Sequence, residues 1–185
     1  RSRVGGEGRA GFIGDAAGAR LPDAIRETRV EHGLEVLDVD PARVPDVLRF
    51  LRDEPDLAFV MLLDVTAIDG LRLGWRERFR VVYHLYSFSR NERVRVTASV
   101  PEEQPEVPSV FSLWKSADWL ERETFDQYGI VFVGHPNLKR LLNHKDFVGH
   151  PLRKDYDIKK GQWLSEPDDL MDQLEKARSG LLPDN

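Results

Sequence analysis

Cysteine is absent from the 185-residue sequence. The chain therefore cannot form a disulfide, use a cysteine nucleophile, or bind zinc or an iron–sulfur cluster through its own thiolates. If the protein works beside redox centres, a partner must hold them.

Long apolar runs are also missing. The longest is Leu57 to Leu63, whereas a membrane-spanning helix needs about 18 residues or more. The first residues do not resemble a secretory signal, and the chain has no Asn-x-Ser/Thr acceptor. The sequence therefore predicts a soluble protein, with a cytoplasmic location as the default.

The charge is unevenly distributed along the chain. Overall, 27 bases against 32 acids give a net charge of −5. Residues 137–160 hold seven bases and three acids, or +4, whereas residues 166–185 hold two bases and six acids, or −4. Such blocks are typical of solvated faces and docking tails, and nucleic-acid binding would require more net positive charge. We expect a protein partner and no nucleic acid.

The chain divides into three predicted parts. Residues 1–20 are rich in Gly, Ala and Arg without apolar periodicity, which predicts a flexible N-terminal arm. This arm contains the sequence G-x-G-x-x-G. A dinucleotide-binding site requires a strand before these glycines, and too few residues precede them to form one, so we reject such a site. An α+β domain is predicted over residues 21–134, and an extended, partner-wrapping segment over residues 135–185.

The periodicity within residues 21–134 predicts an α+β fold, with a mostly antiparallel sheet and helices on one side. We expect a short strand at 34–39 and a helix at 41–53, whose apolar side chains share one face. A strand buried on both faces follows at 57–68, then a hairpin of 76–88 with 92–100. The last elements are a helical stretch from about 109 to 128, with Ser116 as an alternative N-cap at which it restarts and Gly129 as its end, and a strand at 130–133.

Two side chains of the predicted 109–128 helix are notable. Glu121 falls inside the apolar stripe, where a carboxylate requires an ion pair or backbone hydrogen bonds; we expect a base from the downstream basic segment. A catalytic role lacks a second carboxylate or histidine at i+3 or i+4. Trp119 lies on the opposite, polar side, near Arg122, Glu123 and Asp126. It is either a surface aromatic packed under a loop or an anchor for a partner.

A tripeptide occurs twice downstream, as Gly134-His135-Pro136 and Gly149-His150-Pro151. Proline holds each preceding histidine extended and glycine permits a tight turn, which predicts two rigid turns. Each turn precedes a pair of bases, Lys139-Arg140 and Arg153-Lys154. Because the histidine spacing fits no metal-site pattern, we expect the bases to bind carboxylates or helix C-termini of a neighbouring protein.

Two motifs give the sequence a family resemblance. They are Glu121-Arg122-Glu123-Thr124-Phe125-Asp126-Gln127-Tyr128-Gly129, followed by Gly134-His135-Pro136 and Leu138-Lys139-Arg140, and then Gly149-His150-Pro151-Leu152-Arg153-Lys154-Asp155-Tyr156. Together they resemble the C-subunit family of NADH:quinone oxidoreductase, respiratory complex I. The first motif departs from the family pattern at Gln127, where an apolar residue is usual.

The resemblance implies a non-catalytic, cofactor-free scaffold subunit of the hydrophilic arm, whose C-terminal segment wraps the D-subunit near the cluster-bearing B- and I-subunits. Iron–sulfur clusters and flavin would belong to partner subunits of the complex. The enzyme would act as a complex at the cytoplasmic face of the inner membrane, which this chain would contact only through the complex. No residue is expected to be catalytic or to bind metal or cofactor. Those expected to have structural or interface roles are Trp119, Glu121, Arg122, Glu123, Asp126, His135, Lys139, Arg140, His150, Arg153, Lys154 and Asp155.

Two other interpretations remain open. The same motifs resemble the equivalent subunit of membrane-bound nickel–iron hydrogenases and of complexes fed by ferredoxin or a deazaflavin. A free-standing module that binds polyanions or proteins through the basic segment belongs to a different class.

Overall fold

The computed structural model describes residues 11–159, 161 and 162. In chain order its elements are α1 (Phe12–Arg20), β1 (Ile25–Glu31), β2 (Leu34–Val39), the 3₁₀ turn η1 (Pro41–Arg43), α2 (Val44–Asp53), β3 (Met61–Asp69), β4 (Phe79–Ser87), β5 (Glu92–Val100), β6 (Glu106–Pro108), α3 (Ala117–Tyr128) and β7 (Val131–Val133).

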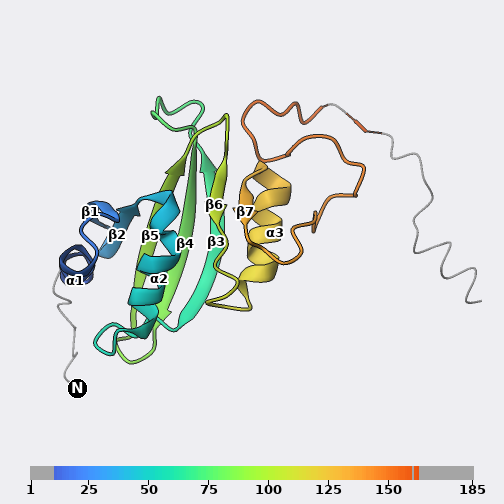
Figure 1. The fold of residues 1–185 in the computed structure, drawn as a ribbon. Helices are drawn as coiled ribbons and strands as arrows, with labels where there is room; N and C mark the ends of the chain where they lie inside the picture. Colours follow the sequence, from blue (N-terminus) through green and yellow to red (C-terminus); the bar gives the residue numbers. More distant parts are fainter. Residues whose placement is uncertain (1–10, 160, 163–185) are drawn as a thin grey trace, which may run out of the picture.

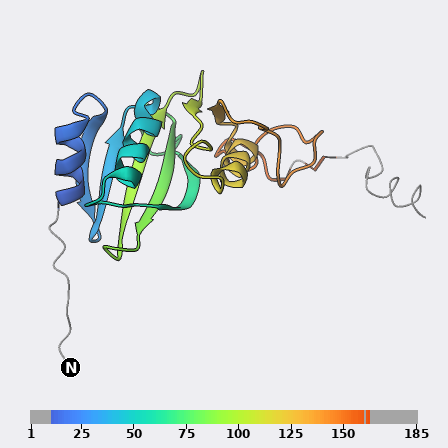
Figure 2. The ribbon, with the colours of Figure 1, turned by 60° about the horizontal axis from the view of Figure 1, so that its bottom comes forward.

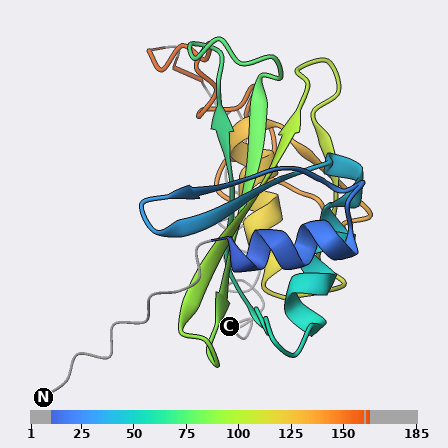
Figure 3. The ribbon, with the colours of Figure 1, turned by 90° about the vertical axis from the view of Figure 1, so that its left-hand side faces the viewer.

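The main sheet has five strands in the order β1-β2-β5-β4-β3. All neighbours are antiparallel except β2 and β5, which run parallel. In Figure 3 the β1–β2 hairpin crosses the longer green strands at a wide angle. Strands β6 and β7 form a separate parallel pair. The predicted α+β fold with a mostly antiparallel sheet is confirmed.

Helices α1 and α2 cover one face of this sheet (Figures 1 and 2). The apolar stripe of α2 is fully buried as predicted, and its residues are Val44, Val47, Leu48 and Leu51. They pack with the inward side chains of β4 and β5 in one continuous core. Burial of this apolar surface is the main term that holds the domain together.

Helix α1 corrects the prediction of a flexible arm over residues 1–20 for the part of that arm from Phe12 to Arg20. Ile13 and Ala17 are buried against the sheet, and the Glu35 carboxylate accepts the backbone N–H groups of Ile13 and Gly14. The sequence did not reveal this helix because small residues, rather than a stripe of large apolar ones, make its contacts. The earlier glycines of the rejected nucleotide motif lie outside the described residues.

Strand β3 also differs from its prediction, because it begins at Met61 and is buried on one face only. Met61, Leu63 and Ile68 are all more than a third exposed. As an edge strand, β3 has a neighbour on one side in the sheet, and α3 packs along it: the Thr124 hydroxyl donates to the Val65 carbonyl at 2.9 Å.

Helix α3 leads into the C-terminal part of the chain. The helix ends at Gly129, whose φ of 74° is the left-handed conformation that favours glycine at this position. The extension, which we define as residues 135–159 with 161 and 162, forms no helix or strand and runs beside α3 (Figure 1). No helix among the described residues is long and apolar enough to span a bilayer.

Candidate functional site

The extension is fixed to α3 at the Asp126 carboxylate. Its Oδ1 accepts from the Arg140 guanidinium at 2.6 Å and from the Asn143 side-chain amide at 3.0 Å. Its Oδ2 accepts three consecutive backbone N–H groups, those of Leu141, Leu142 and Asn143. One buried carboxylate thus organises a whole turn of the extension.

This environment favours the ionised form of Asp126. Burial alone would raise the pKa, but the hydrogen bonds from Asn143, Arg140 and Leu142 outweigh it and lower the pKa from 3.8 to about 2. The side chain of Asp126 is fully buried, and that of Arg140 is 18% exposed. The pair is therefore shielded from solvent, and removing either partner would leave a buried charge without compensation.

The extension also caps the C-terminus of α3. The last carbonyls of a helix lack intrahelical donors. Here the Leu152 N–H donates to the Gln127 carbonyl at 3.1 Å, and the Arg153 guanidinium donates to the Tyr128 carbonyl at 2.6 Å. A cation at this end also complements the helix dipole. A Cβ on Gly129 would lie 2.5 Å from His150 Nε2, so only glycine permits this approach.

The two Gly-His-Pro turns dock on the same helix. His135 Nδ1 accepts the Asn137 N–H, which leaves the hydrogen on Nε2 to donate to the Asp118 carbonyl at 3.2 Å. His150 Nδ1 donates to the Asp126 carbonyl at 2.9 Å. Both turns use a glycine of positive φ. The repeat therefore binds the extension at two points along α3, and burial lowers the pKa of His150.

A second charged cluster joins the extension to the sheet domain. The Arg78 guanidinium, only 5% exposed, binds the Asp69 carboxylate at 2.8 Å, that of Asp155 at 2.6 Å, and that of Glu102. Asp69 also accepts the Lys154 N–H at 2.8 Å. Arg78 and Asp69 belong to the sheet domain and Asp155 to the extension, so this cluster links residues far apart in the sequence.

Burial opposes ionisation of Asp69, but hydrogen bonds from Arg78, Lys154 and Leu71 lower its pKa to about 2. The hydrogen bonds from Asp69 and Asp155 raise the pKa of Arg78. Sequence reasoning missed Arg78 and Asp69. The position of Asp69 at the end of an apolar strand could have indicated this cluster, because a carboxylate that is buried there requires a cation as its partner.

Glu121 is fully buried, as its place in the apolar stripe predicted, but the expected basic partner is wrong. Its carboxylate accepts from the Ser109 hydroxyl at 2.6 Å and the Val110 N–H at 2.7 Å. The downstream base binds Asp126 instead. Burial raises the pKa of Glu121 to about 7 against these two hydrogen bonds, because no cation compensates the charge.

The other residues singled out from the sequence divide into two groups. Arg122 donates to the backbone carbonyls of Lys139 and Arg140, so it too fixes the extension. Trp119, 65% exposed, and Glu123 point away from the domain on successive turns of α3. Arg140 and Arg153 were expected to bind a neighbouring protein, but they bind the carboxylate and the helix C-terminus of their own chain.

The contacts of this site fix the extension to α3 and to the sheet domain. Among residues 11–159, 161 and 162, no three His, Asp or Glu side chains are placed to hold a metal ion. The acidic C-terminal block at 166–185 lies outside the described residues. The site holds the 27 described residues of the extension, which have no regular secondary structure, in one conformation.

The comparisons with known proteins agree with these motifs. A family model described as the 30 kDa subunit of respiratory-chain NADH dehydrogenase matches residues 37–162. The chain belongs to this family. The match covers the sheet from β2 onward, α3 and the described extension, and so includes both charged clusters.

Curated relatives of this 30 kDa subunit family member are named as the C-subunit of NADH-quinone oxidoreductase. The protein from Roseiflexus sp. (strain RS-1) is 48% identical over 137 residues, covering 74% of this chain and 78% of its own. That of Rhodopseudomonas palustris (strain BisB18) is 42% identical over 146 residues, covering 79% and 72%. The predicted resemblance is confirmed.

Two solved structures share the fold. The trypsin-resistant fragment (1–134) of Nqo5 is 32% identical, with a TM-score of 0.59 over 68% of this chain and 96% of its own. A chain of the membrane-bound sulfane sulfur reductase, an archaeal respiratory membrane complex, has a TM-score of 0.64 over 94% and 93%. At 21% identity the second likeness concerns the fold alone.

Proposed function

We propose that this chain is a non-catalytic scaffold subunit in the hydrophilic arm of a proton-translocating NADH:quinone oxidoreductase. It docks the D-subunit through the extension and lies beside the iron–sulfur B- and I-subunits. Partner subunits of the complex hold the iron–sulfur clusters and the flavin, and the complex gives the chain its place at the cytoplasmic face of the inner membrane. The observation that carries the proposal is the extension, which Asp126 and the two Gly-His-Pro turns fix along α3.

The outer side of the extension supports a docking role. Its arginines bind within the chain, whereas Leu142, Val148 and Ile158 are 65%, 73% and 85% exposed. Neither the Lys139 nor the Lys159 ammonium has an ion pair with a described residue. Exposed apolar side chains together with cations on one extension fit a partner surface that is apolar and edged by carboxylates.

The test is a native purification of the complex through a tag on this chain. We expect the D-, B- and I-subunits to co-purify and the preparation to reduce quinone with NADH. The double variant Val148→Asp with Ile158→Asp should abolish co-purification of the D-subunit. The matched control is Leu73→Asp, which changes a leucine 58% exposed in the sheet domain. A chain that purifies alone and binds a polyanion in a salt-dependent way would instead be a free-standing binding module.

The electron-transfer chemistry of the complex is decided by its D-subunit. The names of the curated relatives support the quinone enzyme. A co-purifying D-subunit with two cysteine pairs of the nickel-ligand type would assign the chain to a hydrogenase complex, and reduction by ferredoxin or a deazaflavin would assign it to one of those systems.

A further inference from the structure

A groove of about 310 Å³ lies between α1 and α2. Figure 1 places these helices at the opposite end of the molecule from the extension. The groove is separate from both charged clusters, and its lining residues are Phe12, Ala16, Ala19, Arg20, Phe50, Glu54, Asp56 and Leu57.

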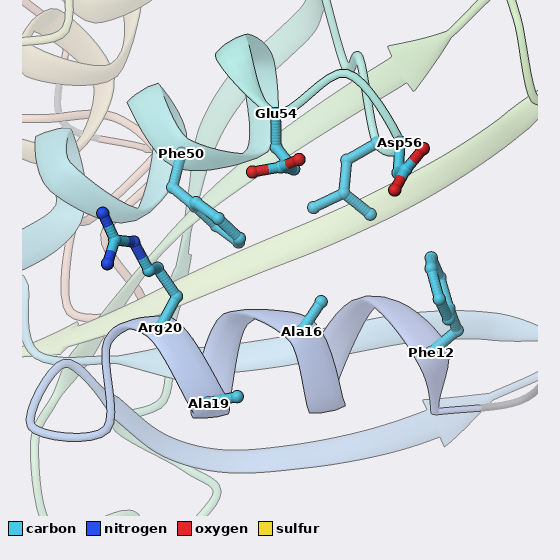
Figure 4. A pocket seen from close by; sticks show the side chains of 8 residues that line it. Phe12, Ala16, Ala19, Arg20, Phe50, Glu54 and Asp56 are labelled. Atoms are coloured by element: carbon cyan, nitrogen blue, oxygen red, sulfur yellow. The ribbon is translucent and has the colours of Figure 1, made fainter.

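The floor of the groove is apolar. Phe12, Ala16 and Ala19 follow helical spacing and form one side of α1, while Ile13 and Ala17 on another side are buried in the core. Figure 4 shows Ala16 between the two aromatic side chains, Phe12 and Phe50. Because alanines are small, they leave a hollow that an inserted side chain can fill.

The α2 side of the groove is negatively charged. The Glu54 and Asp56 carboxylates have no hydrogen bond or ion pair with any described residue. They follow the C-terminus of α2, where the helix dipole adds negative potential. The Arg90 guanidinium lies nearby, but it binds Glu92 and the Asp56 carbonyl and stacks on Phe12. Arg20, the cation lining the groove on the α1 side, forms no ion pair with a described residue.

We propose that this groove receives a large apolar side chain of a neighbouring protein in the complex, with a Lys or Arg beside it that pairs with Glu54 and Asp56. The inference rests on the proposed function, since it requires the chain to work within a complex. A chain that contacts one neighbour through the extension and another through this groove bridges the two, and can hold them in a fixed relation.

Shape selects this occupant over a small ligand. A small ligand requires buried polar groups that fix its orientation, whereas the groove has an apolar floor and its charges stand at the edge. An apolar side chain with an adjacent cation satisfies both the floor and the acidic edge.

The first experiment labels carboxylates with a carbodiimide and glycine ethyl ester, in the free chain and in the complex purified through it. Labelling of Glu54 and Asp56 should fall about fivefold or more in the complex, as expected for side chains buried at an interface. Asp23, an exposed carboxylate beyond α1, should label equally in both. Equal labelling at all three positions overturns the proposal, and so does protection accompanied by a cross-link to a second copy.

The second experiment fills the hollow with Ala16→Trp and compares it with Ala42→Trp, an exposed alanine outside the groove. In competition with the wild type, the first variant should enter the complex about tenfold less often and the second equally well. If circular dichroism shows that Ala16→Trp unfolds the chain, Glu54→Lys against Asp23→Lys makes the same comparison. Equal incorporation of test and control variants overturns the proposal.

Failure of the two proposals can be told apart. A chain that co-purifies with no other protein overturns both. If the chain co-purifies with its partners but Glu54, Asp56 and Asp23 each label to the same extent in the complex as in the free chain, the groove proposal alone is overturned. The proposed scaffold function is then unaffected. The proposal is also overturned if a native mass spectrum of the free chain shows a bound small amphiphile that is missing from the spectrum of Ala16→Trp. The occupant of the groove would then be a small molecule and not a protein side chain.

Discussion

The sheet domain and the extension are held in place by different forces. In the domain, fully buried apolar side chains from α2, β4 and β5 form one core. In the extension, no described apolar side chain is fully buried, although Leu138 packs against the core. The hydrogen bonds that fix its conformation along α3 go to a carboxylate and to helix carbonyls. Burial of apolar surface is non-directional and cumulative, whereas these hydrogen bonds are few, and each depends on a particular charge. The extension should therefore be released by single polar substitutions that leave the domain folded.

Arg78 is the exception to this division, because it binds carboxylates of both regions. Its removal should therefore cause the largest loss of unfolding free energy. Arg78→Gln leaves the Asp69 carboxylate buried without a cation, which costs about 4 kcal/mol of unfolding free energy. Urea unfolding followed by circular dichroism measures this loss. Arg76→Gln is the control, since that side chain is 96% exposed. An unchanged midpoint for Arg78→Gln would mean that the cluster does not join the two regions.

A core substitution should affect the whole chain at once. Leu51→Ala removes a fully buried side chain from α2 and should cost about 3 kcal/mol. Because α3 packs on the sheet, the extension should lose its order in the same transition as the domain. Leu73→Ala, at an exposed position, should leave the transition in place. Protection of extension amides that outlasted the unfolding of the sheet would contradict this dependence.

Glu121 should make the domain less stable as the pH rises. Its pKa is about 7 in the folded chain against an ordinary 4.5, so the folded state binds the proton more tightly. The resulting stability is complete below pH 4.5 and is lost as the pH rises to about 7, a change of about 3 kcal/mol. Glu121→Gln carries no charge, and its amide can accept from Val110 and donate to Ser109.

Thermal unfolding between pH 5 and 8 measures this effect. We expect the stability to fall with rising pH in the wild type and not to fall in Glu121→Gln. Glu123→Gln, an exposed change on the same helix, should keep the wild-type slope. Identical slopes for all three proteins would show that Glu121 does not titrate in this range.

The smallest effect is expected at Trp119. Because this side chain is 65% exposed, Trp119→Ala should change the unfolding free energy of the isolated chain by less than about 0.5 kcal/mol. Trp114→Ala is the contrast, since that indole is 9% exposed and donates to the Val60 carbonyl. A loss above about 1 kcal/mol for Trp119→Ala would place this tryptophan under a loop rather than free for a partner.

Local patterns were enough to predict α2, the β4–β5 hairpin and the end of α3 at Gly129, because each depends on the spacing of nearby residues. They did not predict α1, whose contacts come from small residues, nor the pairing of Arg78 with Asp155, which lie 77 positions apart. They identified the extension's arginines as binders of carboxylates and helix ends. They did not indicate that the carboxylate and the helix belong to the same chain, because spacing along one segment carries no information about its distant contacts.

The most direct test of the difference between the two regions is hydrogen exchange at pH 7 in Asp126→Asn. The amides of Leu141, Leu142 and Asn143 lose their shared carboxylate, and we expect them to exchange about 30-fold faster or more, while the amides of β4 and β5 keep the wild-type rate. Unchanged exchange of the three extension amides, or faster exchange of the sheet amides along with them, would contradict a separate, polar attachment of the extension.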